Sequence, residues 1–139
     1  GHPAQVLAAM DAKAMSFLRV ANAVLPSMVD AGDGRIIGVS GQNAFITGNI
    51  TGAVRNAALN IAAKSLADSV AGSGVTVNTV NPGLVSEHPA SGVAIGKGGE
   101  STPAQIADLI AFLASPLAAA ISGESIATGH RVRGASGMH

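Results

Sequence analysis

The sequence of 139 residues contains no cysteine, no tyrosine and no tryptophan. Without cysteine it can form no disulfide, no thiolate nucleophile and no cysteine-ligated metal site, and without tyrosine it has no phenol to pass a proton. The net charge is zero, and the basic residues cluster no more densely than the pair Arg131 and Arg133, which argues against a nucleic-acid or anionic-membrane surface. No apolar run approaches the roughly 18 to 20 residues that span a bilayer. A cytoplasmic location is predicted.

The apolar content of 47% suits one modest core, so a single domain over residues 1–139 is predicted. Apolar residues recur at spacings of three and four through residues 4–30, which predicts a long amphipathic helix. The patterns farther along predict strands at 36–40, 75–81 and 124–128 and helices at 53–70 and 103–115. This order predicts an α/β fold in which helices pack on the faces of a parallel sheet of about three strands.

Residues 65–85, SLADSVAGSGVTVNTVNPGLV, are the most informative segment. They join a helix end, a glycine turn, an apolar strand and an Asn-Pro-Gly corner. Gly72 and Gly74 can adopt the positive φ that ends a helix. The step from Pro82 to Gly83 stops the strand at its carboxyl end, where open α/β sheets bind their ligands. A site is therefore predicted to begin at this corner.

This segment resembles the short-chain dehydrogenase/reductase family, and the resemblance extends from about residue 5 to about residue 129 in the family's order. It is carried also by Asp33 to Ser40 (DGRIIGVS), by residues 102–116 and by residues 121–127. The resemblance implies a partial Rossmann-like fold and NAD(P)-dependent oxidoreduction of a carbonyl or an alcohol, with NAD or NADP as cofactor.

The sequence departs from the family in two respects. No G-x-x-x-G-x-G turn follows a strand, so the chain resembles only the carboxyl-terminal half. An alignment anchored on residues 65–67 places the family's catalytic tyrosine at Gly52 and its lysine at Asn56. Glycine has no proton to give, and the neutral Asn56 can hydrogen-bond a ribose but cannot shift a neighbour's pKa by charge. A divergent branch, inactive as this chain alone, is expected.

The candidate catalytic residues are Ser40 and Asn56. Ser40 falls at the first position of the family's usual Ser-Ser pair, while Gly41 falls where the catalytic member stands. The alternative for Ser40 is a strand-end hydroxyl that bonds nearby backbone. Lys13 falls near the family's helix asparagine, which helps to hold a proton-relay water, and its alternative is an ordinary solvated lysine.

The candidate cofactor-binding residues follow the second predicted strand. Backbone groups of Asn81, Pro82 and Gly83 are expected to line a nicotinamide pocket, with Ser86 in place of the family's amide-binding threonine. The alternative is a corner that the chain path alone requires. His88, in the loop 84–100, is the neutral-pH acid or base nearest this site or else an exposed loop histidine. The four histidines show no metal-ligand spacing, so no metal site is predicted.

A homo-oligomer is predicted through helices 4–30 and 53–70, because small residues let helices approach closely and the resembled family forms a dimer bundle with these helices. The strand at 36–40 would have an unpaired edge, which also invites a partner chain or strand exchange. Two other functions remain open: a non-catalytic oligomerising scaffold, and a binding module that uses the loop 84–100 as a lid over a small apolar ligand.

Overall fold

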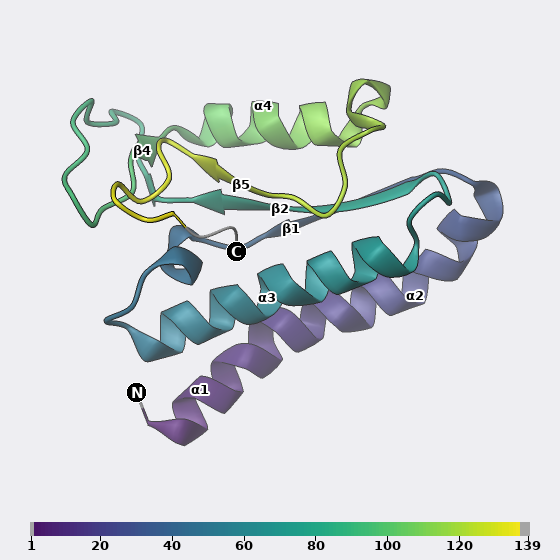
Figure 1. The fold of residues 1–139 in the computed structure, drawn as a ribbon, viewed down its shortest axis with the longest axis horizontal. Coiled ribbons are helices and arrows are strands. Elements are labelled where there is room, and N and C mark those ends of the chain that lie inside the picture. Colours follow the sequence, from purple (N-terminus) through teal and green to yellow (C-terminus); the bar gives the residue numbers. More distant parts are fainter. Residues whose placement is uncertain (1, 137–139) are drawn as a thin grey trace.

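The structure is a computed structural model that describes residues 2–136. A parallel sheet separates two layers of helices, as Figure 1 shows, with α4 on one face and α1, α2 and α3 on the other. The helices are α1 (Pro3–Met10), α2 (Ser16–Ala31), α3 (Ile50–Ser69) and α4 (Pro103–Ala114). The strands are β1 (Gly34–Val39), β2 (Val75–Pro82), β3 (Leu84–Val85), β4 (Glu100–Ser101) and β5 (Ser125–Thr128).

The main sheet has the order β1-β2-β5, and both pairings are parallel. Gly34 lies opposite Val75 and Val39 opposite Val80, while Thr79 begins the pairing with Ser125. The predicted α/β fold with three parallel strands is therefore confirmed. Within residues 2–136, no helix is both long and apolar enough to cross a bilayer.

The predicted helix over residues 4–30 is present, but it is not one regular α-helix. A π-helical turn, Asp11–Met15, separates α1 from α2, and the Ser16 N–H donates to the carbonyl of Asp11 five residues earlier. Ala14 and Ala21 on the predicted apolar face are buried against the rest of the protein. The helix ends at Gly32, whose φ of 67° is the left-handed conformation that glycine favours.

The strand predicted at 36–40 is nearly all apolar, and such a sequence predicts a strand that is covered on both faces of a parallel sheet. In the structure β1 begins at Gly34 and is mostly half-buried, and the Val39 side chain is 49% exposed. The reason is topological, since β1 is an edge strand whose only neighbour among the described residues is β2. Its outer edge is the one that the sequence predicts to be unpaired.

The central strand β2 is buried along almost its whole length, and half of its residues are polar. Asn78 shows how such residues are accommodated: its Nδ2 donates to the Ile121 carbonyl at 2.9 Å, and its Oδ1 accepts from the Glu124 N–H at 3.0 Å. The Gly123 N–H donates to the Val77 carbonyl at 2.8 Å. These bonds bring the chain into register for β5, because buried polar groups must be paired.

Helices α3 and α4 begin at side-chain caps. Asn49 accepts from the Gly52 N–H, so α3 starts three residues before the predicted position 53. Thr102 and Gln105 form a capping box at the start of α4.

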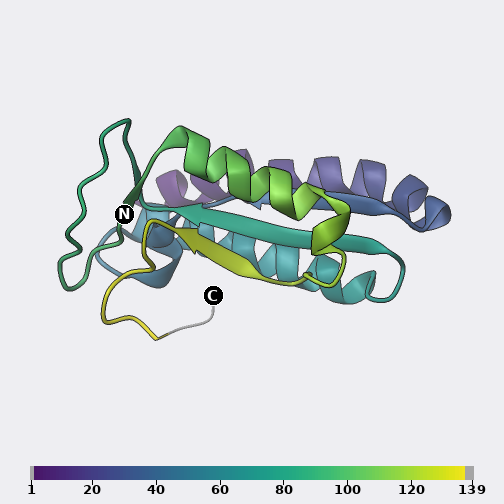
Figure 2. The ribbon, with the colours of Figure 1, turned by 90° about the horizontal axis from the view of Figure 1, so that it is seen from above.

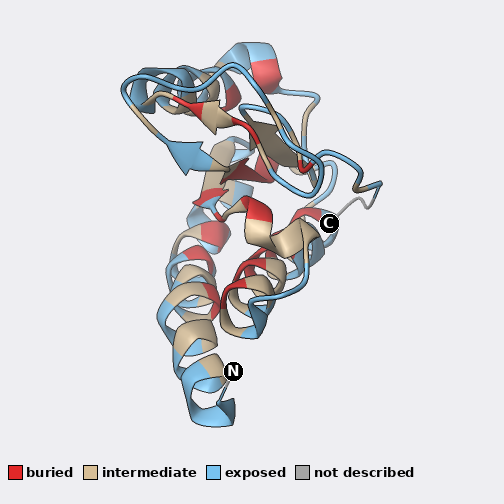
Figure 3. Ribbon diagram, turned by 90° about the vertical axis from the view of Figure 1, so that its left-hand side faces the viewer, coloured by how far each residue is buried: buried red, intermediate tan, exposed pale blue. Residues whose placement is uncertain are grey.

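Two apolar clusters pack on opposite faces of the sheet, one around Val77 and the other around Val80 and Leu113. Figure 3 shows buried residues along the facing sides of the two long helical segments.

The segment between β3 and β4 is irregular and projects beyond the carboxyl ends of the strands, as Figure 2 shows. Its two ends pair with each other, with Leu84 opposite Glu100 and Val85 opposite Ser101. The predicted loop 84–100 is thus closed at its base. It brings its glycine-rich end back to the corner after β2.

Candidate functional site

A cavity of about 460 Å³ lies where β1 and β2 end. Ser40 and Gly41 follow β1, and Asn56 reaches the cavity from α3. Pro82 is the last residue of β2, and Gly83 follows it. A 3-10 turn, Gln42–Phe45, and the end of the loop before β4 complete the wall. This is the carboxyl edge of a parallel sheet, where α/β folds bind ligands.

Ser40 is buried and bonded to the backbone of α3. Its Oγ donates to the Asn56 carbonyl at 3.0 Å, and its N–H donates to the Val80 carbonyl at 2.8 Å. The hydroxyl hydrogen is therefore engaged by the protein, while the oxygen lone pairs can still accept a hydrogen bond. This is the backbone-bonded geometry of the alternative interpretation, although the residue also lines the cavity.

Lys13 reaches the cavity from the π-helical turn. Its Nζ donates to Asn56 Oδ1 at 2.7 Å, and Arg55 Nε lies at 3.5 Å from the same oxygen. Burial and, secondly, the nearby Arg55 guanidinium lower the pKa of Lys13 from 10.5. Lys13 is therefore a half-buried cation at the site and not a solvated surface lysine.

The sequence contains a signal for this pair that reasoning on single positions missed. Relative to the resembled family, the two residue types are exchanged: a lysine stands near the helix asparagine's position, and Asn56 stands at the lysine's position. In the structure their side chains meet. The positive charge that position 56 lacks thus comes from position 13, on the neighbouring helix.

The two positions that the resemblance predicts for the family's serine and tyrosine are packed glycines. A Cβ on Gly41 would lie 2.8 Å from Asn56 Nδ2, and a Cβ on Gly52 would lie 2.9 Å from Asn43 Nδ2. Side-chain amides therefore fill the space into which larger side chains would extend. Asn43, which sequence reasoning did not single out, lines the cavity.

Of the predicted cofactor residues at the corner after β2, some line the cavity and one does not. Pro82 and Gly83 line the cavity, but the Asn81 side chain is fully buried, where its Oδ1 accepts from Asn60 and its Nδ2 donates to Thr79. A Cβ on Gly83 would collide with the carbonyl oxygen of the residue before Glu100. The corner therefore needs glycine so that the loop can return beside it.

Ser86 and His88 lie outside the cavity wall. Ser86 Oγ accepts from the His88 N–H at 3.2 Å, and the Ser86 N–H donates to the Ser101 carbonyl at 2.9 Å. His88 is exposed. The structure thus brings Ser40, Asn56 and the Pro82–Gly83 step together and places Asn81, Ser86 and His88 apart from them.

Gln42 is a structural support that the sequence did not reveal. Its Nε2 donates to the carbonyls of Thr128 and His130, both at 3.0 Å, and only 5% of the residue is exposed. Its Oε1 is buried without a hydrogen-bond partner, in close contact with Gly98 of the loop. Gln42 therefore ties the end of β5 to the cavity wall.

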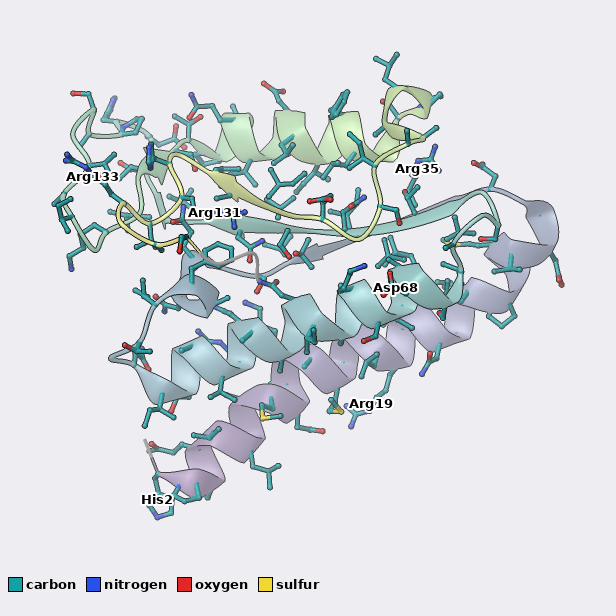
Figure 4. The ribbon with its side chains drawn as sticks, in the orientation of Figure 1. His2, Arg19, Arg35, Asp68, Arg131 and Arg133 are labelled. Carbon is teal, nitrogen blue, oxygen red and sulfur yellow. The ribbon has the colours of Figure 1, made fainter. Side chains whose placement is uncertain are left out.

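Arginines reinforce the same end of the molecule, where Figure 4 places Arg131 and Arg133. The Arg131 guanidinium lies 4.4 Å from the centroid of the Phe45 ring, and its Nη2 donates to the Ser125 carbonyl at 2.6 Å. Arg133 Nη1 donates to the Val93 carbonyl at 3.0 Å. These contacts hold the segment after β5 against the 3-10 turn and the loop.

The fit of a nicotinamide dinucleotide to this site is partial. A cavity of about 460 Å³ suits a nicotinamide ring together with a small carbonyl compound. The backbone at Pro82 and Gly83 offers a wall without bulky side chains. The sequence contains no glycine-rich turn between a strand and a helix that could hold the pyrophosphate. The cavity thus has room for the nicotinamide end of the cofactor only.

Comparison with known proteins gives consistent matches. A family model described as enoyl-(acyl carrier protein) reductase matches residues 2–129. The 3-oxoacyl-(acyl-carrier-protein) reductase FabG of Vibrio cholerae serotype O1 is 36% identical over 137 residues, covering 84% of this chain and 53% of that protein. The FabG of Vibrio harveyi is 37% identical over 130 residues, covering 78% and 49%. The chain spans about half the length of these curated relatives.

Solved structures share the fold. A 3-oxoacyl-(acyl-carrier-protein) reductase with bound NAD from Brucella melitensis superposes with a TM-score of 0.80 at 20% identity, covering 95% of this chain and 53% of that one. YwfH, an NADPH-dependent reductase involved in bacilysin biosynthesis, gives a TM-score of 0.75 at 24% identity, covering 88% and 56%.

Proposed function

The chain belongs to the short-chain dehydrogenase/reductase family, and we propose that it forms the substrate-side, carboxyl-terminal half of an NAD(P)-dependent reductase that interconverts a carbonyl compound and an alcohol. The observation that carries this proposal is the cavity at the ends of β1 and β2. It brings Lys13, Ser40 and Asn56 together beside the Pro82–Gly83 corner.

When bound, NAD(P) supplies or accepts the hydride. In this proposal Lys13 donates to the substrate oxygen, Ser40 accepts from the hydroxyl group of the alcohol, and Asn56 orients the Lys13 ammonium through the bond at 2.7 Å. The lowered pKa of Lys13 makes its ammonium a stronger acid than that of an ordinary lysine, so it can hold and release a proton at Nζ. The Pro82–Gly83 backbone forms the wall for the nicotinamide.

The isolated chain is proposed to be inactive, because it lacks a pyrophosphate-binding turn and, without a tyrosine, depends on Lys13 alone for the proton. The experiment compares this chain with a fusion in which the amino-terminal half of the Vibrio cholerae relative precedes it. NADH and NADPH binding is followed by fluorescence, and turnover by absorbance with methyl acetoacetate as the ketone. We expect weak binding by the isolated chain and restored binding by the fusion.

The fusion also tests the assigned residues. Turnover by the fusion should fall in Ser40→Ala and Lys13→Met while nucleotide affinity changes little, whereas Ser69→Ala, on the exposed end of α3, serves as the matched control. The intact Vibrio cholerae relative serves as the positive control for nucleotide binding. If it binds and a well-folded fusion binds neither nucleotide, the reductase proposal is refuted.

A second candidate function is a non-catalytic oligomerising scaffold, and one observation favours it. A mostly apolar hollow of about 460 Å³ lies between α3 and the start of β5, and the Ile61 side chain is 65% exposed. The α3 wall of this hollow includes Val54, Ala57, Ala58 and Ile61. Apolar surface of this kind commonly marks an interface. A homo-oligomer through α3 and the α1–α2 helix belongs to this proposal, and a cytoplasmic location stays a prediction.

The two candidates respond differently to charge on α3. Replacing Ala57 and Ala58 together with glutamate should dissociate an oligomer, measured by sedimentation velocity, while Ser65→Glu on the exposed side should not. If the chain is a scaffold, the double glutamate variant loses binding to its partner protein as well as self-association. A reductase fusion retains nucleotide binding in its dissociated form.

A further inference from the structure

The cavity described above is lined by three cationic side chains, Lys13, Arg55 and Lys97. Among the described residues that line it, none is aspartate or glutamate. We propose that the cavity binds an anionic group of its ligand, a carboxylate or a phosphate, between Lys13 and Arg55, with Lys97 contributing from the loop. This inference rests on the proposed function, in that it assigns a charge class to the substrate of the same site.

The three cations have no acidic partner in the part of the chain that the structure describes. The ion pairs there join Arg19 to Asp11, Lys64 to Asp68 and, at 3.9 Å, Arg35 to Asp33. All of these lie elsewhere. Because the net charge of the chain is zero, the positive charge at the cavity is a local concentration and not the property of a basic protein.

The arrangement of the two inner cations holds them close together. Lys13 Nζ and Arg55 Nε approach the same acceptor, Asn56 Oδ1, at 2.7 and 3.5 Å. A neutral amide oxygen satisfies hydrogen bonds but does not neutralise charge. The proximity of Arg55 is one of the two causes that lower the pKa of Lys13, so the two cations repel each other.

An anion between these groups would remove that repulsion. A guanidinium offers paired N–H donors to a carboxylate or phosphate, and an ammonium adds a compact charge beside it. Lys97 lies on the exposed part of the loop that returns to the corner, so it can reach a ligand that enters from solvent. Steering by exposed positive charge then brings the anion to the inner pair.

The test uses the complete chain without nucleotide, followed by two-dimensional amide NMR titration. The probes are acetoacetate, its neutral methyl ester and inorganic phosphate. We expect acetoacetate or phosphate to shift amides of residues 40–43 and 55–56, and the ester to bind at least about tenfold more weakly than acetoacetate. Lys13→Met and Arg55→Met should each weaken anion binding about tenfold or more, while Lys64→Met, a lysine outside the cavity, should leave it unchanged.

The outcomes separate the sources of the anion and the two proposals. Shifts with phosphate alone assign a phosphoryl group, and shifts with acetoacetate alone assign a carboxylate; either supports the site. No shift with either anion up to about 50 mM, or equal binding of acid and ester, would overturn it. If Lys13→Met does not fold, the anion binding of Arg55→Met and Lys97→Met tests the proposal instead. Because no nucleotide is present, a failure of the reductase fusion leaves this result standing.

Discussion

The contact between Lys13 and Asn56 can be tested by replacing Asn56 with leucine, which has a similar size and no acceptor. The lost bond is short, 2.7 Å, charge-assisted and partly buried. Hydrogen bonds to charged groups contribute about 1.5–3 kcal/mol, so we expect Asn56→Leu to lower the free energy of unfolding by about 2 kcal/mol. In Lys13→Met the same replacement should cost less than about 0.5 kcal/mol, because only the long contact of 3.5 Å with Arg55 Nε then remains to be lost.

The coupling between the two positions is therefore expected to be about 1.5 kcal/mol. It is measured by urea unfolding of the wild type, both single variants and the double variant. With a urea dependence of about 1–3 kcal/mol per molar, the single variant Asn56→Leu should move the midpoint by roughly 1 M. Asn22→Leu, on the exposed face of α2, is the control and should change the stability by less than about 0.5 kcal/mol.

A coupling below about 0.5 kcal/mol would refute this account of the site. It would mean that the ammonium finds an equivalent partner, such as water, once the amide is removed. The assignment of Asn56 as the residue that positions Lys13 would then fail, whatever the effect of each single substitution.

Three further outcomes are expected. The pKa of Lys13 in the folded chain lies below its unfolded value of 10.5, so between these two pKa values the unfolded chain binds more protons than the folded one. The free energy of unfolding should therefore rise with pH in that window, and the rise should vanish in Lys13→Met. Urea unfolding curves recorded up to pH 10.5 measure it. Gln42→Ala loses two hydrogen bonds to backbone carbonyls and should cost about 1–3 kcal/mol by thermal unfolding. Gly74→Ala should cost more than about 2 kcal/mol, because a Cβ there meets a backbone carbonyl as well as a positive φ, whereas Gly72→Ala meets only the φ and should cost about 1 kcal/mol; similar losses for both would contradict the steric argument.

The alternation of helices and strands was predictable because periodicity and glycine positions are local properties of the sequence. The strand after Gly74 and the helix after Thr102 lie where their patterns indicate, within a residue or two. Burial was harder to predict, since it depends on the position of a strand in the sheet. Apolar β1 is an edge strand, whereas β2, with polar residues such as Asn78, lies at the centre.

The sequence indicated in outline which residues lie together at the ends of β1 and β2. The sequence identified Ser40, Asn56 and the Pro82–Gly83 corner, which do share one cavity. It could not show that Lys13 meets Asn56, because the contact joins residues 43 positions apart through the packing of two helices. Gln42 gave no signal at all, because its role depends on the carbonyls that β5 brings to it.

The π-helical turn at Asp11–Met15 limits which insertions and deletions this chain can accept. Each residue of an α-helix advances the direction of its side chains by about 100°. The π-helical turn closes its hydrogen bond over five residues instead of four, so it already absorbs one extra residue, and removing one residue there would make the helix regular while α1 keeps its packing surface toward α3. Removing one residue from a regular turn of α1 or α2 would instead rotate part of the helix by about that angle. Changes in length should therefore be accepted in loops such as residues 86–99 and, for the loss of one residue, in the π-helical turn, but not in the regular turns of α1 and α2.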